Sequence, residues 1–349
     1  MKVTAKNRAL IIAVSMLFIL FFKYLPAPAG LSVAAMQVVG IFIGVLIMWM
    51  TISIDWPSML CLAALAFVPG VSMNSILSSG MGNATFAFLM FTFMCTYTLS
   101  QTPFIRRCAI AFLTTKSAQK SPWSFITLYF ACALFLGTFM SPTVLVVILI
   151  AITEEIFTVL GFEKGDKAAD MMMMGMVFCS SIGAGMTPIA HVFPLMAMGY
   201  YTTATGNTIS YAQYMAMGVP AGILATVVMM AIFRFVIRPD LSGIKSLDIS
   251  HLKSELPAMG KKEKYALAIF FTVIALWVVP GVVRPWLPAV YNYINGFGTA
   301  MPPLLGAVAM AIVTVDGEPL LSFKDATGKG IPWASLIMVS ATLALGSQL

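Results

Sequence analysis

Hydroxyl side chains, glycines and prolines interrupt two long apolar stretches of this chain. These interruptions are the positions where a binding site for a ligand or an ion is most readily formed. The first stretch, Trp123–Phe157, is interrupted at Gly137–Thr143. The second, Met171–Tyr201, is interrupted at Ser180–Pro188. In hydrocarbon, a broken helix leaves backbone N–H and C=O groups without partners, which is costly unless protein or water satisfies them. Membrane proteins that accept this cost commonly use the freed groups to hold a ligand or an ion.

These freed groups are suited to an anion together with a small cation. Helices that restart near Thr143 and after Pro188 would present free N–H groups and a partial positive charge to an anion. Freed carbonyls around Gly137–Met140 and Gly183–Met186 could coordinate Na⁺. The alternative is that the glycines only allow close helix packing and that the prolines only kink helices. Two interruptions in consecutive segments, both rich in Ser, Thr and Gly, favour the binding interpretation.

His191 lies just past the second interruption. It could be a proton-sensitive group or a hydrogen-bond donor to substrate. The alternative is a packed histidine whose hydrogen bonds are satisfied inside the protein.

Other kinds of site are disfavoured by what the chain contains. Two histidines and five scattered cysteines without a CxxC pair offer no histidine-based metal cluster. All thirteen acidic residues lie in loops or at the ends of apolar runs, which counts against a proton relay. No Ser-His-Asp set, HExxH or Walker loop is present, and Ser141 has no acidic residue nearby to support a nucleophile. We therefore expect no enzyme activity and no cofactor.

The composition sets the protein class. Hydrophobic residues make up 60% of the chain and charged residues only 9%, whereas soluble domains carry about 25% charged residues. This predicts a polytopic, all-α membrane protein. The net charge of +7 is explained by the positive-inside rule and not by nucleic-acid binding.

Apolar runs of near-spanning length divide the rest of the chain. Together with Met171–Tyr201, taken as one discontinuous crossing, they predict about nine crossings: Ala9–Tyr24, Leu31–Ile52, Trp56–Val71, Ala84–Leu99, Tyr211–Val236, Tyr265–Leu287, Phe297–Val313 and Ile331–Leu349. The first run also has the features of a signal peptide cleaved after Ala29, and a first transmembrane helix has the same pattern.

The distribution of basic residues decides how Trp123–Phe157 meets the membrane. If this region enters and leaves on one side, eighteen of the twenty Lys and Arg residues face one compartment, and only Lys23 and Arg284 face the other. The N-terminus is then cytoplasmic. A pair of short spans and a re-entrant hairpin both satisfy this. Because each arm is short and Pro142 favours a turn, the hairpin, with its tip at Ser141–Thr143, is the preferred interpretation.

Two flanking segments are expected at the cytoplasmic surface. Pro103–Lys120 has the pattern of an interfacial helix. It would have an apolar face toward the acyl chains and basic residues near headgroups: Ile105, Ala109, Phe112 and Leu113 against Arg106, Arg107, Lys116 and Lys120. The polar linker Asp240–Lys264 is predicted to contain a short surface helix.

The order of these parts resembles the divalent anion/sodium symporter family, which carries dicarboxylates, citrate or sulfate. Ser141-Pro142-Thr143 stands where that family has Ser-Asn-Thr at the tip of its first hairpin, and Ser181–Thr187 resembles its glycine-rich unwound loop. Leu256–Lys264, followed by Trp277, resembles its cytoplasmic linker and next helix, and Gly330-Ile331-Pro332-Trp333 resembles the entry into the helix before its second hairpin.

The resemblance implies an inverted-repeat fold, elevator-like movement, a homodimer, and binding at the tip and the loop. It implies substrate contacts at Ser141, Pro142, Thr143, Thr187, Pro188 and His191, and sodium ligands at Gly137, Thr138, Ser141, Gly183 and Gly185. Pro142 replaces the family asparagine and removes an amide and a backbone donor. Ala190-His191 stands where the family often has Gly-Thr, so His191 could contact an unusual substrate.

An internal parallel predicts how the chain is divided. Ser347-Gln348 ends the last apolar run as Ser100-Gln101 ends the run Ala84–Leu99. By that parallel the second repeat is incomplete, and we expect a truncated transporter. The expected parts are N-terminal scaffold helices and the interfacial helix (1–120), the hairpin and discontinuous helix (121–210), a helix and the cytoplasmic linker (211–264), and the start of the second repeat (265–349).

The sequence and the resemblance together predict a secondary active anion transporter, coupled to Na⁺ as a symporter, in the cytoplasmic membrane. Its partners would be a small anionic substrate, sodium ion, membrane lipid and a second copy of the chain. The alternatives are a sodium-independent anion permease or exchanger, and a truncated membrane protein that does not transport.

Overall fold

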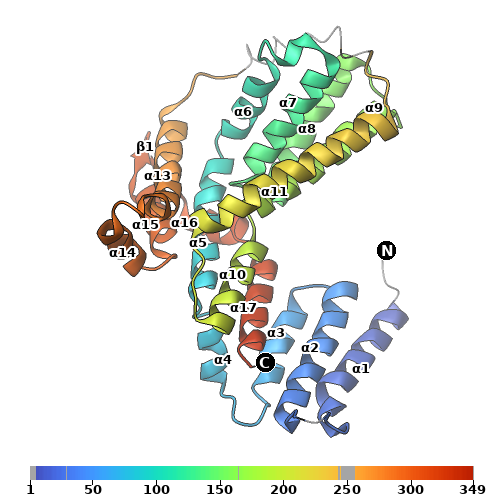
Figure 1. Cartoon of the computed structure of the whole chain (residues 1–349), viewed down its shortest axis with the longest axis vertical. Coiled ribbons are helices and arrows are strands. Elements are labelled where there is room, and N and C mark those ends of the chain that lie inside the picture. Colours follow the sequence, from blue (N-terminus) through green and yellow to red (C-terminus); the bar gives the residue numbers. More distant parts are fainter. Residues whose placement is uncertain (1–4, 29, 164, 243, 245–255, 349) are drawn as a thin grey trace. The chain divides into compact units, whose positions relative to one another are not determined.

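The computed structural model describes residues 5–348 except 29, 164, 243 and 245–255 (Figure 1). Within that part, the regular elements are helices apart from one ladder of two short strands. Contacts divide the chain into two compact units, Met1–Phe93 with Thr327–Leu349, and Met94–Ala326.

The first unit is a group of apolar helices around a buried core (Figure 1). Its core residues include Ile41, Met48 and Leu65, which are fully buried. Helices α1 and α2 approach closely at Gly44, which has no side chain to keep them apart. A Cβ at this position would lie only 2.6 Å from the Ser15 carbonyl oxygen. The elements are α1 (Ala5–Phe21), η1 (Phe22–Tyr24), α2 (Val33–Thr51), α3 (Trp56–Leu65), α4 (Met73–Ser79), the first part of α5 (Ala84–Ser100), and α17 (Trp333–Gly346). Ala29, the possible cleavage position, lies outside the described residues.

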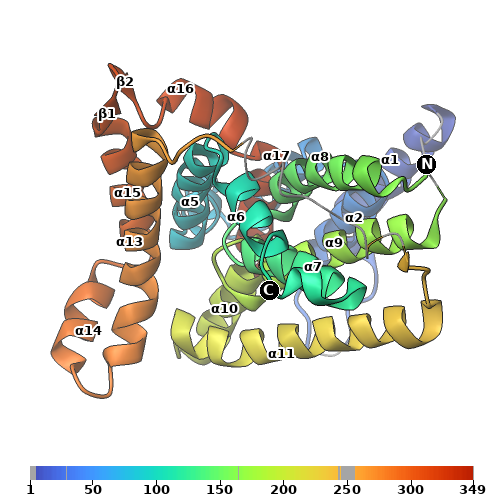
Figure 2. The same ribbon diagram turned by 90° about the horizontal axis from the view of Figure 1, so that it is seen from above.

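The second unit contains both predicted interruptions. Its helices α6 to α9 pack on one another, and α13 packs beside α15 (Figure 2). The elements up to α11 are α6 (Phe104–Leu113), η2 (Ala118–Lys120), α7 (Pro122–Gly137), α8 (Pro142–Leu160), α9 (Lys167–Met186), α10 (Val192–Thr205) and α11 (Tyr211–Ile232). The later elements are η3 (Phe233–Ile237), α13 (Lys261–Val283), α14 (Pro288–Gly296), α15 (Met301–Ile312), β1 (Thr314–Val315), β2 (Glu318–Pro319) and α16 (Phe323–Asp325). The next element, η5 (Ala326–Gly330), begins at the last residue of this unit and otherwise belongs to the first.

Local signals set the limits of the α7–α8 pair. Ser121 accepts a hydrogen bond from the Ser124 N–H at the start of α7, where Pro122 occupies the first turn. Helix α8 ends at Gly161, which adopts the left-handed conformation with φ of 67°. The Tyr129 and Thr153 hydroxyls form a buried hydrogen bond between the two helices. At 1.5 Å per residue, the 16 residues of α7 span about 24 Å. This is shorter than the hydrocarbon core of a bilayer, which is about 30 Å thick.

Helix α9 corrects the predicted position of the second interruption. The sequence placed the break at Ser180–Pro188, but α9 continues through Gly183 and Gly185 to Met186. The chain leaves the helix at Thr187, whose φ and ψ are −130° and 152°. A residue that precedes proline is driven toward extended conformations, so Pro188 ends the helix and the glycines do not. The second break therefore comprises residues 187–191.

Helix α6 corrects the prediction for the interfacial segment. Its apolar side chains Ile105, Ala109 and Leu113 are buried, and the helix packs against α7 and α8. Arg106 and Arg107 pair with Glu155 and Glu263 of the same chain. The amphipathic pattern was predicted correctly, but its apolar face is covered by protein and not by acyl chains. Most of the surface helix predicted in the 240–264 linker falls on residues 245–255, outside the described residues.

The number of crossings stays a prediction. Among the residues that the structure describes, six helices are long and apolar enough to span a membrane, or up to eight if each of two bent helix pairs counts as one span. Helices α3, α7 and α15 are shorter apolar helices. The chain is accordingly a multi-pass membrane protein.

Two helices that end in Ser-Gln share a local hydrogen-bond pattern. The Ser100 hydroxyl donates to the Tyr97 carbonyl and the Ser347 hydroxyl to the Ala344 carbonyl, each at 2.7 Å. Each following glutamine amide donates to that serine hydroxyl. Both helices also follow a bend, of 51° before α5 and 72° before α17.

Candidate functional site

The two helix breaks meet in the second unit. The Thr187 hydroxyl, at the end of α9, donates a hydrogen bond to the Thr138 carbonyl, at the end of α7. The helices also approach backbone to backbone: a Cβ on Gly183 would lie 2.3 Å from the Leu134 carbonyl oxygen, and one on Gly137 would lie 2.6 Å from the Ser180 carbonyl oxygen. Four of the predicted site residues, Gly137, Thr138, Gly183 and Thr187, are thus brought together.

The first break is a tight turn that leaves two hydroxyls uncommitted. The Ser141 carbonyl accepts the N–H groups of Val144 and Leu145 at 3.1 Å, which closes the first turn of α8. Pro142 at its start has no N–H to donate. The half-buried Ser141 hydroxyl and the exposed Thr143 hydroxyl donate to and accept from none of the described residues. These hydroxyls and the positive end of α8 are available to a ligand.

The second break uses its polar side chains internally. The Thr187 hydroxyl also accepts the Ile189 N–H at 3.3 Å. His191 is the N-cap of α10, because its Nδ1 accepts the Phe193 N–H at 3.4 Å, and its ring lies 4.6 Å from the Phe193 ring. Pro188 is buried. Among the described residues, no hydrogen bond joins His191 to Ser141.

Gly185 lies apart from the other predicted sodium ligands. It is exposed, and its carbonyl accepts the Tyr214 hydroxyl of α11 at 2.9 Å. The sequence did not single out Tyr214. The signal that could have found it is a phenol in the first turn of an otherwise apolar run.

The electrostatics at the breaks come from backbone groups and hydroxyls. Residues 137–143 and 180–191 contain no Asp, Glu, Lys or Arg. The last carbonyls of an α-helix have no partner in a following turn, and those of Gly137 and Gly183 accept no backbone N–H from outside their own helices in the described part of the chain. The arrangement can hold a cation with neutral oxygens and an anion at the start of α8.

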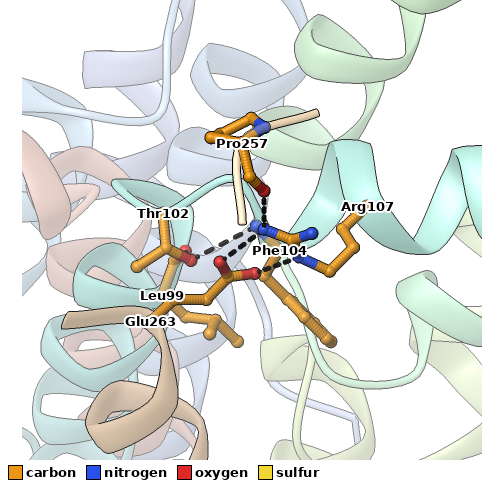
Figure 3. Close-up of polar contacts among 6 residues, drawn as sticks. All are labelled: Leu99, Thr102, Phe104, Arg107, Pro257 and Glu263. Atoms are coloured by element: carbon orange, nitrogen blue, oxygen red, sulfur yellow. Dashed lines mark hydrogen bonds and ion pairs between the residues drawn. The ribbon is translucent and has the colours of Figure 1, made fainter. Parts of the chain in front are cut away.

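A buried ion pair supports α6, the helix that leads into this region (Figure 3). The Arg107 guanidinium donates to both Glu263 carboxylate oxygens at 2.9 Å and to the Pro257 carbonyl at 2.9 Å. The Glu263 side chain is only 3% exposed and that of Arg107 is 22% exposed. Hydrogen bonding to Glu263 raises the pKa of Arg107, so the guanidinium stays charged. It ties α6 to the start of α13.

A turn at the start of α6 completes this support. The Thr102 hydroxyl donates to the Leu99 carbonyl at 2.7 Å and accepts the Phe104 N–H at 3.4 Å (Figure 3). This holds the connection from α5 into α6. The sequence suggested headgroup contacts for Arg107 and did not predict its pairing with Glu263.

A cavity of about 230 Å³ lies elsewhere in the second unit, between the end of α5, the first turns of α13 and the β1–β2 hairpin. It contains no residue of either break. Its one lysine, Lys262, is paired with Glu318 at 2.9 Å, and Asp325 adds a further carboxylate. This charge balance does not favour an anion, so the breaks remain the better candidate site.

Comparison with known proteins places the chain among transporters. A membrane protein of Cupriavidus necator is 20% identical over 93% of the chain and 64% of its own length. The sodium-dependent dicarboxylate transporter SdcS of Staphylococcus saprophyticus is 25% identical over 60% of the chain and 42% of its own length. The chain therefore spans less than two thirds of either relative. The citrate transporter family matches residues 44–349. This confirms the resemblance to anion transporters and excludes an enzyme: the chain belongs to the citrate transporter family.

Proposed function

We propose that the chain forms the first binding half of a secondary active transporter for anions of the dicarboxylate, citrate or sulfate class, coupled to Na⁺. The observation that carries this proposal is the junction of the two helix breaks through Thr187 and Thr138, beside two uncommitted hydroxyls at the start of α8.

The substrate contacts lie at the first break. The Ser141 and Thr143 hydroxyls donate to an anionic oxygen, and the first-turn N–H groups of α8 add the positive end of the helix dipole. Hydrogen bonds to charged groups contribute about 1.5–3 kcal/mol each. Thr187 and His191 hydrogen-bond within the second break, so we assign the direct substrate contacts to Ser141 and Thr143. The predicted substrate contacts of Thr187, Pro188 and His191 stay predictions.

The sodium ligands are backbone oxygens at the junction of α7 and α9. The Gly137 and Gly183 carbonyls are candidates, and the Thr138 carbonyl retains one lone pair after accepting the Thr187 hydroxyl. Neutral oxygens of this kind coordinate Na⁺ in transporters with discontinuous helices. The staphylococcal relative is itself a sodium-dependent dicarboxylate transporter.

The wider architecture follows from the same hypothesis. Helices α7 and α8 form a re-entrant hairpin in the cytoplasmic membrane, with the N-terminus cytoplasmic. The bends before α5 and α17, and the Ser-Gln pattern at their ends, support two inverted repeats. The transporter works as a homodimer by elevator-like movement.

Two observations favour a second candidate, a sodium-independent anion permease or exchanger. Gly137 and Gly183 are required for the close packing of α7 on α9, so their presence does not by itself imply a cation. Pro142 also lacks the amide that the related symporters carry at the hairpin tip. A membrane protein that binds neither ion is the third outcome of the experiment below.

The test is thermal unfolding of the purified chain in detergent, in Na⁺ or choline, with dicarboxylates, citrate or sulfate. A ligand at 100 times its Kd stabilises the folded state by about 2.7 kcal/mol. Symport predicts a rise in Tm with Na⁺ that an anion increases further. A rise with an anion in choline as large as that in Na⁺ would support the permease. No rise under any condition would contradict both.

A further inference from the structure

Helix α14 has three chemically distinct faces. Tyr291 and Ile294 are half-buried, on a helix that packs against α13. Val290, Tyr293 and Phe297 share a second face and are 43%, 71% and 54% exposed. Asn292 and Asn295 share a third face and are exposed. The exposed surface of this short helix is thus divided into an apolar half and a polar half.

The helix before α14 in the chain also has an exposed apolar stripe. Ala275, Val279 and Val282 recur at helical spacing on α13 and are exposed. Helix α13 is long and apolar enough to span a membrane, so this stripe is its lipid-facing side. The next position of the stripe is Trp286, which is 74% exposed.

The end of this stripe carries the chemistry of a membrane–water boundary. Trp and Tyr are enriched at that depth because one end of each ring is apolar and the other is polar. The Arg284 guanidinium lies 4.8 Å from the centre of the Tyr291 ring, a cation–π contact that leaves its N–H groups able to reach lipid phosphates. Helix α14 lies at the end of α13 away from the β1–β2 hairpin (Figure 2).

We propose that α14 lies flat in one membrane–water boundary and binds phospholipid. Val290, Tyr293 and Phe297 insert among the outer acyl carbons, Arg284 contacts phosphate, and Asn292 and Asn295 face water. The partner is lipid and not a second copy of the chain, because α14 follows a membrane-spanning helix and this end of that helix has an exposed Trp286 and the Arg284–Tyr291 pair, side chains typical of a membrane–water boundary. The division into apolar and polar halves is what a boundary between two solvents selects.

The test measures the depth of each face in phospholipid vesicles that contain the whole chain. Single cysteines replace Tyr293 or Phe297 on the apolar face and Asn292 or Asn295 on the polar face, in a Cys108→Ser background. Each is labelled with an environment-sensitive fluorophore. Nitroxide lipids labelled near the headgroup quench from the membrane, and iodide quenches from water.

We expect labels at 293 and 297 to lose most of their fluorescence to the shallow nitroxide lipid and little to iodide, with the reverse at 292 and 295. Iodide quenching at all four positions would overturn the proposal by placing α14 in water. Protection of 293 and 297 from both quenchers, together with energy transfer between labelled copies, would overturn it in favour of a dimer contact. Because two positions report on each face, one misfolded variant does not decide the result.

Discussion

The two helix breaks differ in how they use their polar groups. At the first, the Ser141 and Thr143 hydroxyls have no partner among the described residues. At the second, Thr187 donates to the Thr138 carbonyl and accepts the Ile189 N–H, and His191 caps α10. Buried polar groups are normally paired within the protein. The difference supports our proposal that the first break contacts the ligand, whereas the second break joins the ends of α7 and α9.

The largest expected effect comes from the Arg107–Glu263 ion pair that supports α6, in which both carboxylate oxygens accept hydrogen bonds within the protein. Arg107→Met would leave the Glu263 carboxylate buried without a partner. We expect a loss of about 3 kcal/mol, measured as a lower thermal midpoint in detergent. Glu318→Gln, which breaks an exposed pair with Lys262, should leave the midpoint unchanged. Equal effects of the two changes would show that burial does not govern these pairs.

The next effect tests the packing that joins the breaks. Gly183→Ala places a Cβ 2.3 Å from the Leu134 carbonyl oxygen, which forces α7 and α9 apart. We expect destabilisation of up to about 3 kcal/mol. Gly185→Ala is the matched control, because a Cβ there meets nothing within 4 Å. If neither substitution lowers the stability, the prediction that α7 and α9 pack too closely at Gly183 to admit a side chain is contradicted.

A smaller effect is expected where the second break is fastened. Thr187→Val removes the donor to the Thr138 carbonyl and the acceptor for the Ile189 N–H. Buried groups left without partners should cost about 1–2 kcal/mol of stability, in the absence of any ligand. Thermal unfolding without Na⁺ or anion measures this. An unchanged midpoint would mean that the hydrogen bonds of the Thr187 hydroxyl contribute nothing to stability.

The smallest effect concerns His191. If it serves only as the N-cap of α10, His191→Asn keeps the cap and should change stability by less than about 0.5 kcal/mol, whereas His191→Ala should cost about 1 kcal/mol. Anion affinity should be the same for both variants. A weaker anion affinity in His191→Asn at unchanged stability would show that His191 contacts the substrate and is more than a helix cap.

The first break was predictable because its signal is local. Pro142 cannot donate and disfavours helix in the residue before it, so the turn lies where the sequence placed it. The second break was placed too early, because Gly183 and Gly185 resemble helix breakers but remain helical. Gly183 stays in the helix at its close contact with α7, which no local pattern shows.

Contacts between residues far apart in the chain could not be predicted from the sequence. The periodicity of α6 predicted an apolar face but not whether lipid or protein covers it. Arg107 and Glu263 are separated by 156 positions, and a single sequence does not reveal which of many acidic residues a given arginine meets. The family resemblance supplied the candidate residues, and the geometry separates those that are used internally from those that are not.

The most direct test compares anion affinity and stability in two variants. We predict that Ser141→Ala/Thr143→Val raises the anion Kd at least about tenfold, since two hydrogen bonds to a charged ligand are lost, without changing the thermal midpoint in the absence of ligand. Thr187→Val should do the reverse. Thr158→Val, at the far end of α8 with its hydroxyl bound to its own helix, is the control. A lower midpoint with unchanged Kd in the Ser141/Thr143 variant would contradict the assignment of the first break to ligand binding.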